Sequence, residues 1–130
     1  MKILQPAGWP RPKGYSNGIS ATGRTIFTAG VIGWDEREFL VSHRLDGQFA
    51  QALNNILAIL KEDGAGPEHI VRLTIYVTDI QEYIGLRDEL APIWKSIMGA
   101  NYPAMALVQV VRLVEPSAKV EIEATAVVPE

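Results

Sequence analysis

Apolar side chains recur at three- and four-residue steps in two segments of the chain, which is the spacing of one face of an α-helix. The first segment opens at Gln48 and ends at Gly64, and the second runs over residues 83–97 and ends at Gly99. Pro92 lies inside the second segment, where we expect a bend or a shifted start because proline has no N–H to donate. The pattern therefore predicts two amphipathic helices.

Further segments are rich in β-branched and aromatic residues and are bounded by turn signals, which is typical of strands. Residues 15–34 predict a hairpin that turns at Thr22 and Gly23, and residues 70–79 predict one strand with a fully apolar face. Residues 104–114 and 118–128 predict a second hairpin. The first 14 residues are rich in proline and glycine, a composition that favours an extended arm.

The order of these elements predicts a two-layer α+β domain in which both helices cover one face of a single mixed sheet. The chain of 130 residues has the length of one domain, which we place at residues 1–130. The other face of the sheet lacks a cover, although residues 104–114 are mostly apolar on both sides of the predicted strand. We therefore expect a homo-oligomer whose sheets pack against each other.

Composition narrows the classes of function. The formal net charge is −3 and the cations are scattered along the chain, which disfavours nucleic acid as a main partner. The absence of cysteine excludes thiol nucleophiles and thiolate metal sites, and with no segment of signal-peptide or membrane-span length we expect a cytoplasmic protein without a membrane partner. His43 and His69 have no second ligand at metal-binding spacing, so we infer no metal and no cofactor.

Three runs of sequence resemble the RidA/YjgF family of reactive-intermediate (enamine/imine) deaminases, from about residue 15 to residue 128. They are "GYSNGI...IFTAGVIGWD", "QALNNILAILKEDGAGPEHIVRLTIYVTD" and "YPAMALVQVVRLVEPSAKVEIEATAVV". The resemblance implies a chorismate-mutase-like fold and a homotrimer with a central barrel of sheets. It also implies small-molecule clefts at the subunit interfaces, which agrees with the missing cover of the sheet.

The resemblance also implies an arginine that grips the carboxylate of a 2-imino acid, and here the chain departs from the family. That arginine follows the Pro-Ala pair, but the residue after Pro103 and Ala104 is Met105. A thioether cannot replace five donors and a fixed charge. Two positions further on, where many members have a cysteine, the chain has Leu107.

Other positions match the family pattern, namely Tyr15, the backbone at Ala29 and Gly30, and Glu121. In the cleft, Glu121 could activate water or protonate an enamine carbon if apolar neighbours raised its pKa. The strand pattern alone favours a solvated or ion-paired glutamate in register with Lys119 and Glu123, and with the resemblance added both interpretations stay open. Tyr15 could donate to a ligand or simply open a strand as a half-buried aromatic residue.

Three further positions are weaker candidates for substrate binding. Arg87 lies where the family places a polar cleft residue, but its acidic neighbours favour a solvated helix face. Trp34 could line the rim of the cleft or pack between subunits. Glycine in a strand, as at Gly30, more often marks a bulge or tight packing than a binding site.

Two hypotheses of function remain. The first is a trimeric imine or enamine hydrolase whose substrate range is altered because Met105 replaces the arginine. The second is a non-catalytic, small-molecule-binding or regulatory trimer whose clefts are apolar, which Met105 and Leu107 favour. A purely structural role would leave Glu121 unexplained.

Overall fold

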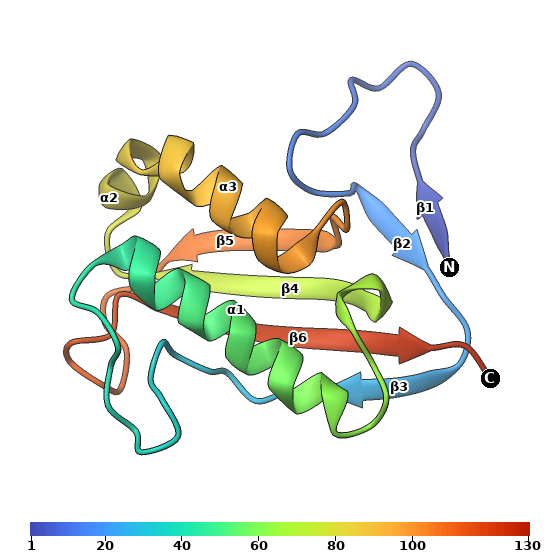
Figure 1. Cartoon of the computed structure of the whole chain (residues 1–130). Coiled ribbons are helices and arrows are strands. Elements are labelled where there is room, and N and C mark those ends of the chain that lie inside the picture. The colour runs from blue at the N-terminus through green and yellow to red at the C-terminus, as the bar shows by residue number, and fades with distance from the viewer.

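The computed structural model describes residues 1–130 and contains six strands, three α-helices and one short 3₁₀-helix (Figure 1). The strands are β1 (Lys2–Leu4), β2 (Gly18–Ser20), β3 (Arg24–Phe27), β4 (Ile70–Val77), β5 (Ala104–Gln109) and β6 (Val120–Val128). The helices are α1 (Leu45–Lys61), η1 (Pro67–His69), α2 (Ile80–Gly85) and α3 (Arg87–Met98). None of the helices is long and apolar enough to cross a membrane.

The main sheet has four strands in the order β3-β6-β4-β5. β6 runs antiparallel to both of its neighbours, and β4 and β5 run parallel. Helices α1 and α3 lie on the same face of this sheet, so the predicted mixed sheet and two-layer α+β fold are confirmed (Figure 1). No helix covers the opposite face, although Tyr76 on that face packs on a small cluster of Ile32, Leu113 and Ala118.

The core lies between the sheet and the two helices. Side chains of α1 interdigitate with alternate side chains of β4 and β6, which are buried on this face and only partly covered on the other. Eight buried core residues come from the two central strands: Ile70, Leu73, Ile75, Val77, Val120, Ile122, Ala124 and Ala126. The alternation predicted for residues 70–79 and 118–128 is therefore the alternation between core and open face.

Both predicted hairpins are wrong. β2 pairs with β1 in a separate two-stranded sheet, while β3 pairs with β6. The strands flanking residues 115–117 do not pair either, because β5 follows α3 and returns parallel to β4, as a crossover connection requires. The N-terminal arm is held against β2 by β1, which is extended, and turns at residues 7 and 8.

The strand expected over residues 104–114 ends at Gln109. The last ladder bond joins the Val110 N–H to the Val77 carbonyl, and β4 ends there, so the residues beyond have no partner strand. Val111 and Val114 are each 96% exposed. Burial on both sides is therefore wrong for the second half of this segment within one chain.

The helices also differ from expectation in their bounds. α1 begins three residues earlier than expected, at Leu45, which is buried. The second helical segment breaks at Leu86 rather than bending at Pro92, which lies inside α3. Gly85 immediately precedes the break, and glycine is a weak helix former.

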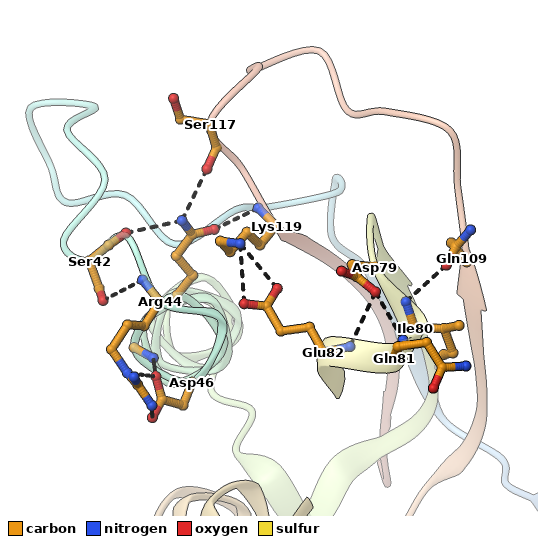
Figure 2. Close-up of polar contacts among 12 residues, drawn as sticks. Ser42, Arg44, Asp46, Asp79, Ile80, Gln81, Glu82, Gln109, Ser117 and Lys119 are labelled. Carbon is orange, nitrogen blue, oxygen red and sulfur yellow. Dashed lines mark hydrogen bonds and ion pairs between the residues drawn. The ribbon is translucent and has the colours of Figure 1, made fainter. Parts of the chain in front are cut away.

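A buried glutamine joins two loops to the first turn of α1. Gln48 is fully buried; its Nε2 donates to the carbonyls of Ser42 (3.0 Å) and Ser117 (3.1 Å), and its Oε1 accepts from the Lys119 N–H (2.7 Å) (Figure 2). A Cβ at Gly33 would lie 2.6 Å from the Gln48 Cα, so this loop also packs tightly on α1. The amide therefore satisfies backbone groups that no strand or helix pairs.

Replacing Gln48 by alanine will leave three partly buried backbone groups without their side-chain partner. We expect Gln48→Ala to lower the free energy of unfolding by about 3 kcal/mol, measured by urea denaturation. Gln51 provides the matched control, because its Nε2 donates only to Asn55 on the same helix. Gln51→Ala should cost less than about 1 kcal/mol, and equal effects of the two variants would contradict the role given to Gln48.

Candidate functional site

An apolar cleft opens between α3, β5 and the end of the N-terminal arm. It consists of two hollows, of about 390 and 330 Å³, that share Lys13, Gly14, Ile75, Tyr83 and Met105. The larger hollow is completed by Phe49, Arg87, Leu90, Ala91, Trp94 and Tyr102, and the smaller one by Tyr15 and Leu107. We call the two together the Met105 cleft. It brings together four predicted site residues: Tyr15, Arg87, Met105 and Leu107.

The arm reaches this cleft because Ser16 fastens it to the start of β5. The Ser16 side chain is buried and its hydroxyl donates to the Tyr102 carbonyl, while its N–H donates to the Pro103 carbonyl (3.0 Å). Ser16 also forms a parallel bridge with Ala104. Lys13, Gly14 and Tyr15 are thereby held beside Met105, with Gly14 in the left-handed turn (φ 81°) that a side chain would disfavour.

The other wall of the cleft depends on how α2 is attached to the sheet. The Asp79 carboxylate accepts from the N–H groups of Gln81 and Glu82, and the Gln109 side chain accepts from the Ile80 N–H (Figure 2). Lys119 donates to the Glu82 carboxylate at 3.1 Å. These bonds join α2 to β5 and to the start of β6, and they hold Tyr83 in the cleft wall.

The charge in the Met105 cleft is purely cationic. Lys13 and Arg87 are exposed, neither forms an ion pair, and no acidic side chain lines either hollow. Burial raises the pKa of Tyr83, and the Arg87 charge partly opposes that shift. The Tyr83 hydroxyl is therefore protonated at neutral pH and can donate a hydrogen bond.

Stacked aromatic rings form part of the cleft wall, with Trp94 buried and Tyr102 exposed. The rings of Trp94 and Tyr102 are nearly parallel, with centroids 6.1 Å apart and an interplanar angle of 12°. The Trp94 Nε1–H is buried and has no acceptor in the chain. A flat apolar group is the natural partner for such a wall.

The remaining predicted site residues lie elsewhere. Glu121 is half-buried on β6 and forms no ion pair within the chain; its neighbour Lys119 pairs with Glu82. The Glu121 carboxylate lies over Gly30, where a Cβ would come within 2.5 Å of Oε2. Tyr76 pairs with Glu121 across the strands and donates to Glu123 instead (2.8 Å), a bond that raises the pKa of Tyr76.

Ala29 and Gly30 form a bulge beside this carboxylate. The Thr28 N–H donates to the Ala124 carbonyl, and the Val31 N–H donates to the Ile122 carbonyl. Ala29 and Gly30 therefore both face Glu123, the single residue between these two partners. Neither the Ala29 nor the Gly30 N–H donates to an acceptor in the protein. The bulge thus offers two free donors next to a free carboxylate.

The two groups of residues lie on opposite faces of the sheet. Met105 and Leu107 pair with Leu73 and Ile75, whose side chains are in the core under the helices. Glu121 pairs with Tyr76, on the open face. Because residues opposite each other in a sheet share a face, one chain does not bring Met105 and Glu121 into one site.

Trp34 belongs to neither group. It packs with Leu40 on a small cluster around Ile32 and Leu113. Conversely, Lys13, Tyr83, Trp94 and Tyr102 line the cleft and were not expected there. The signal for two of them was the helical stripe, in which Tyr83 and Trp94 combine an aromatic ring with a polar atom that a pure core position does not need.

Comparison with known proteins places the chain in a family. The family model described as endoribonuclease L-PSP matches residues 10–128. A RutC family protein from Synechocystis is 33% identical over 132 residues, which cover 99% of this chain and 98% of the relative. Human 2-iminobutanoate/2-iminopropanoate deaminase is 32% identical over 97% of this chain and 89% of its own length.

Solved structures agree with the sequence comparisons. YyfB from Yersinia pestis, a Rid family protein, has a TM-score of 0.85 and 31% identity, with 98% of both chains covered. TdcF from E. coli, solved with bound serine, has a TM-score of 0.71 and 27% identity, with 98% of this chain and 99% of that chain covered. The chain therefore belongs to the endoribonuclease L-PSP family, which confirms its resemblance to the RidA/YjgF proteins. Its deaminase relatives support imine deamination as a general function of the family.

A methyl group at residue 30 should displace the Glu121 carboxylate. If this carboxylate is catalytic, Gly30→Ala will lower activity on imines by about 100-fold, since small misplacements of a reacting group are costly. Gly85→Ala provides the control, because a Cβ there meets nothing within 4 Å. Ammonia release at saturating substrate is the measurement, and full activity of Gly30→Ala would argue against a role for Glu121.

Proposed function

We propose that the protein is an enamine/imine deaminase, a hydrolase that converts a reactive imine to a carbonyl compound and ammonia. The observation that carries the proposal is the Glu121 carboxylate, which has no protein partner and lies beside the free N–H groups of Ala29 and Gly30. A carboxylate in that state can exchange protons with water, and the two donors can orient the water or the product oxygen.

We further propose a homotrimer in which each site is built by two copies. Met105 and Glu121 face opposite sides of one sheet, so the open face of a second copy must supply the carboxylate to the Met105 cleft. The open face contains exposed Phe27 (75%) and Val108 (43%), apolar side chains that a neighbouring sheet would cover. Tyr15, at the mouth of the cleft, would then donate to the bound substrate or water.

The proposed reaction begins from the protonated imine. Glu121 accepts a proton from water as the water oxygen bonds to the imine carbon, which gives a carbinolamine. Glu121 then protonates the amine nitrogen. The C–N bond breaks with its electron pair on ammonia while the hydroxyl proton returns to Glu121, and the carbonyl product remains.

A second candidate function is a non-catalytic trimer that binds a small molecule. The apolar side chains of Met105 and Leu107 in the cleft favour it. They stabilise an apolar ligand by excluding water, whereas they offer no charge or hydrogen-bond donor to a small acid. Mass spectrometry of the purified protein distinguishes the two functions. A ligand that is recovered unchanged after incubation, with no ammonia release from any imine, would favour binding over catalysis.

Glu121→Gln should abolish most of the acceleration over buffer. We expect a loss of about 10²- to 10⁴-fold in the rate of ammonia release from imines generated in situ, because the amide cannot accept the proton. Glu123→Gln is the matched control on the same strand and face, since the amide oxygen can still accept from Tyr76. Equal activity of wild type and Glu121→Gln, with the oligomer intact by analytical ultracentrifugation, would refute the mechanism.

Met105→Arg should restore an anchor for small 2-imino acids. A bidentate, charge-assisted contact would orient the carboxylate, and we expect about a tenfold or larger gain in kcat/KM for the imine derived from alanine. Met105→Leu controls for repacking of the apolar wall. An inert but folded Met105→Arg protein would mean that more than the anchor differs from the deaminases.

A further inference from the structure

The Met105 cleft combines a large apolar wall with a cationic mouth. Eight of the eleven side chains around the larger hollow are hydrophobic, and Phe49, Leu90 and Trp94 form its buried end. The two charges, Lys13 and Arg87, come from different parts of the chain, namely the N-terminal arm and the first turn of α3. Both are exposed, so they lie where a ligand enters rather than where it ends.

Neither of these two cations is held by another charged or polar side chain of the folded chain. Neither makes a hydrogen bond to a protein side chain, and Asp88 and Glu89, which follow Arg87, neither pair with it nor line the hollows. Only Arg24, Arg44 and Lys119 of the twelve lysines and arginines are paired with acids, so what distinguishes Lys13 and Arg87 is that both line the same cleft. Unpaired cations of two elements that converge on one cleft complement an anionic ligand.

The size of the cleft sets what the anion can be attached to. A hollow of about 390 Å³ lies in the range of small-molecule sites and exceeds what a two- or three-carbon acid would fill. A small acid would leave the apolar wall in contact with water, and binding would then lack the favourable free energy of burying that surface. The ligand that suits the cleft is therefore an amphipathic acid with a bulky, flat apolar group.

We propose that Lys13 and Arg87 replace the missing arginine as the carboxylate anchor and that the cleft selects 2-imino acids with bulky, preferably aromatic, side chains. The side chain of the substrate lies against Trp94 and Tyr102. Met105 also packs against this side chain, which a charged residue at position 105 would not do. The substrate class rests on the proposed deaminase function. The anchor and the preference for bulk can be tested by binding alone.

Isothermal titration calorimetry with phenylpyruvate tests the proposal without catalysis, since this oxo acid is the product that hydrolysis of the phenylalanine-derived imine would release. Two matched ligands separate charge from bulk: phenylacetone has a methyl group in place of the carboxylate, and pyruvate lacks the ring. We expect phenylpyruvate to bind at least about tenfold more tightly than either one. Equal affinity for phenylpyruvate and phenylacetone, or no binding of phenylpyruvate, would overturn the proposal.

Variants of the two cations identify the anchor. Lys13→Gln and Arg87→Gln should each weaken phenylpyruvate binding about five- to tenfold and leave phenylacetone binding unchanged. Both residues are exposed and unpaired, so neither change should impair folding. Lys95→Gln, on the same helix as Arg87 but outside the cleft, should bind phenylpyruvate as wild type does. Unaltered binding by the Lys13/Arg87 double variant would refute the anchor.

Activity assays separate this proposal from the deaminase function. Cation-dependent binding of phenylpyruvate without ammonia release from any imine would uphold the ligand class and refute the deaminase. Conversely, equal acceleration for the imines derived from phenylalanine and from 2-phenylethylamine, unaffected by Arg87→Gln, would uphold the deaminase and refute the carboxylate anchor. Faster hydrolysis of the phenylalanine-derived imine, diminished by Arg87→Gln, would support both.

Discussion

The register of β4 with its two neighbouring strands is the constraint on which the site depends. It places Met105 opposite Leu73, under the helices, and Glu121 opposite Tyr76, on the open face. Shifting either pairing by one residue would exchange the two faces and expose the core, so the apolar alternation of β4 and β6 enforces this arrangement. The carboxylate and the apolar cleft therefore lie on opposite faces of one sheet, and the proposed deaminase site needs a second copy to bring them together.

The cleft itself is assembled from parts that are distant in the sequence. Ser16 ties the arm to β5, and Lys119 and Gln109 tie α2 to the sheet. These polar contacts fix the positions of Lys13 and Tyr83 without contributing to the apolar wall. The site therefore depends on hydrogen bonds at the margins of the core, where a change can move the cleft and leave the fold intact.

Met105 adds apolar surface and no charge to the centre of the cleft. The charge at the centre of the cleft is absent, and the cations that remain are at its mouth, on the arm and on α3. Near water, each contributes less than a buried guanidinium would. In the proposed site, binding therefore relies more on the apolar surface, which is why we propose a substrate with a bulky side chain as well as a carboxylate.

Local patterns determined the helices and the two central strands, because the 3.6- and 2-residue periods reflect which side chains face a core. They could not determine pairing: both predicted hairpins were wrong, since a turn signal does not show which strand lies alongside. β5 pairs with β4, far away in sequence, because α3 carries the chain back across the sheet.

The sequence by itself therefore determined the fold class, the family and the absence of an arginine at residue 105. Only the tertiary structure decided that Lys13 and Arg87 converge on one cleft and that Glu121 lies on the other face. The physical reason is that periodicity records burial, whereas a site depends on long-range register and on the hydrogen bonds of loops, which leave no period in the sequence.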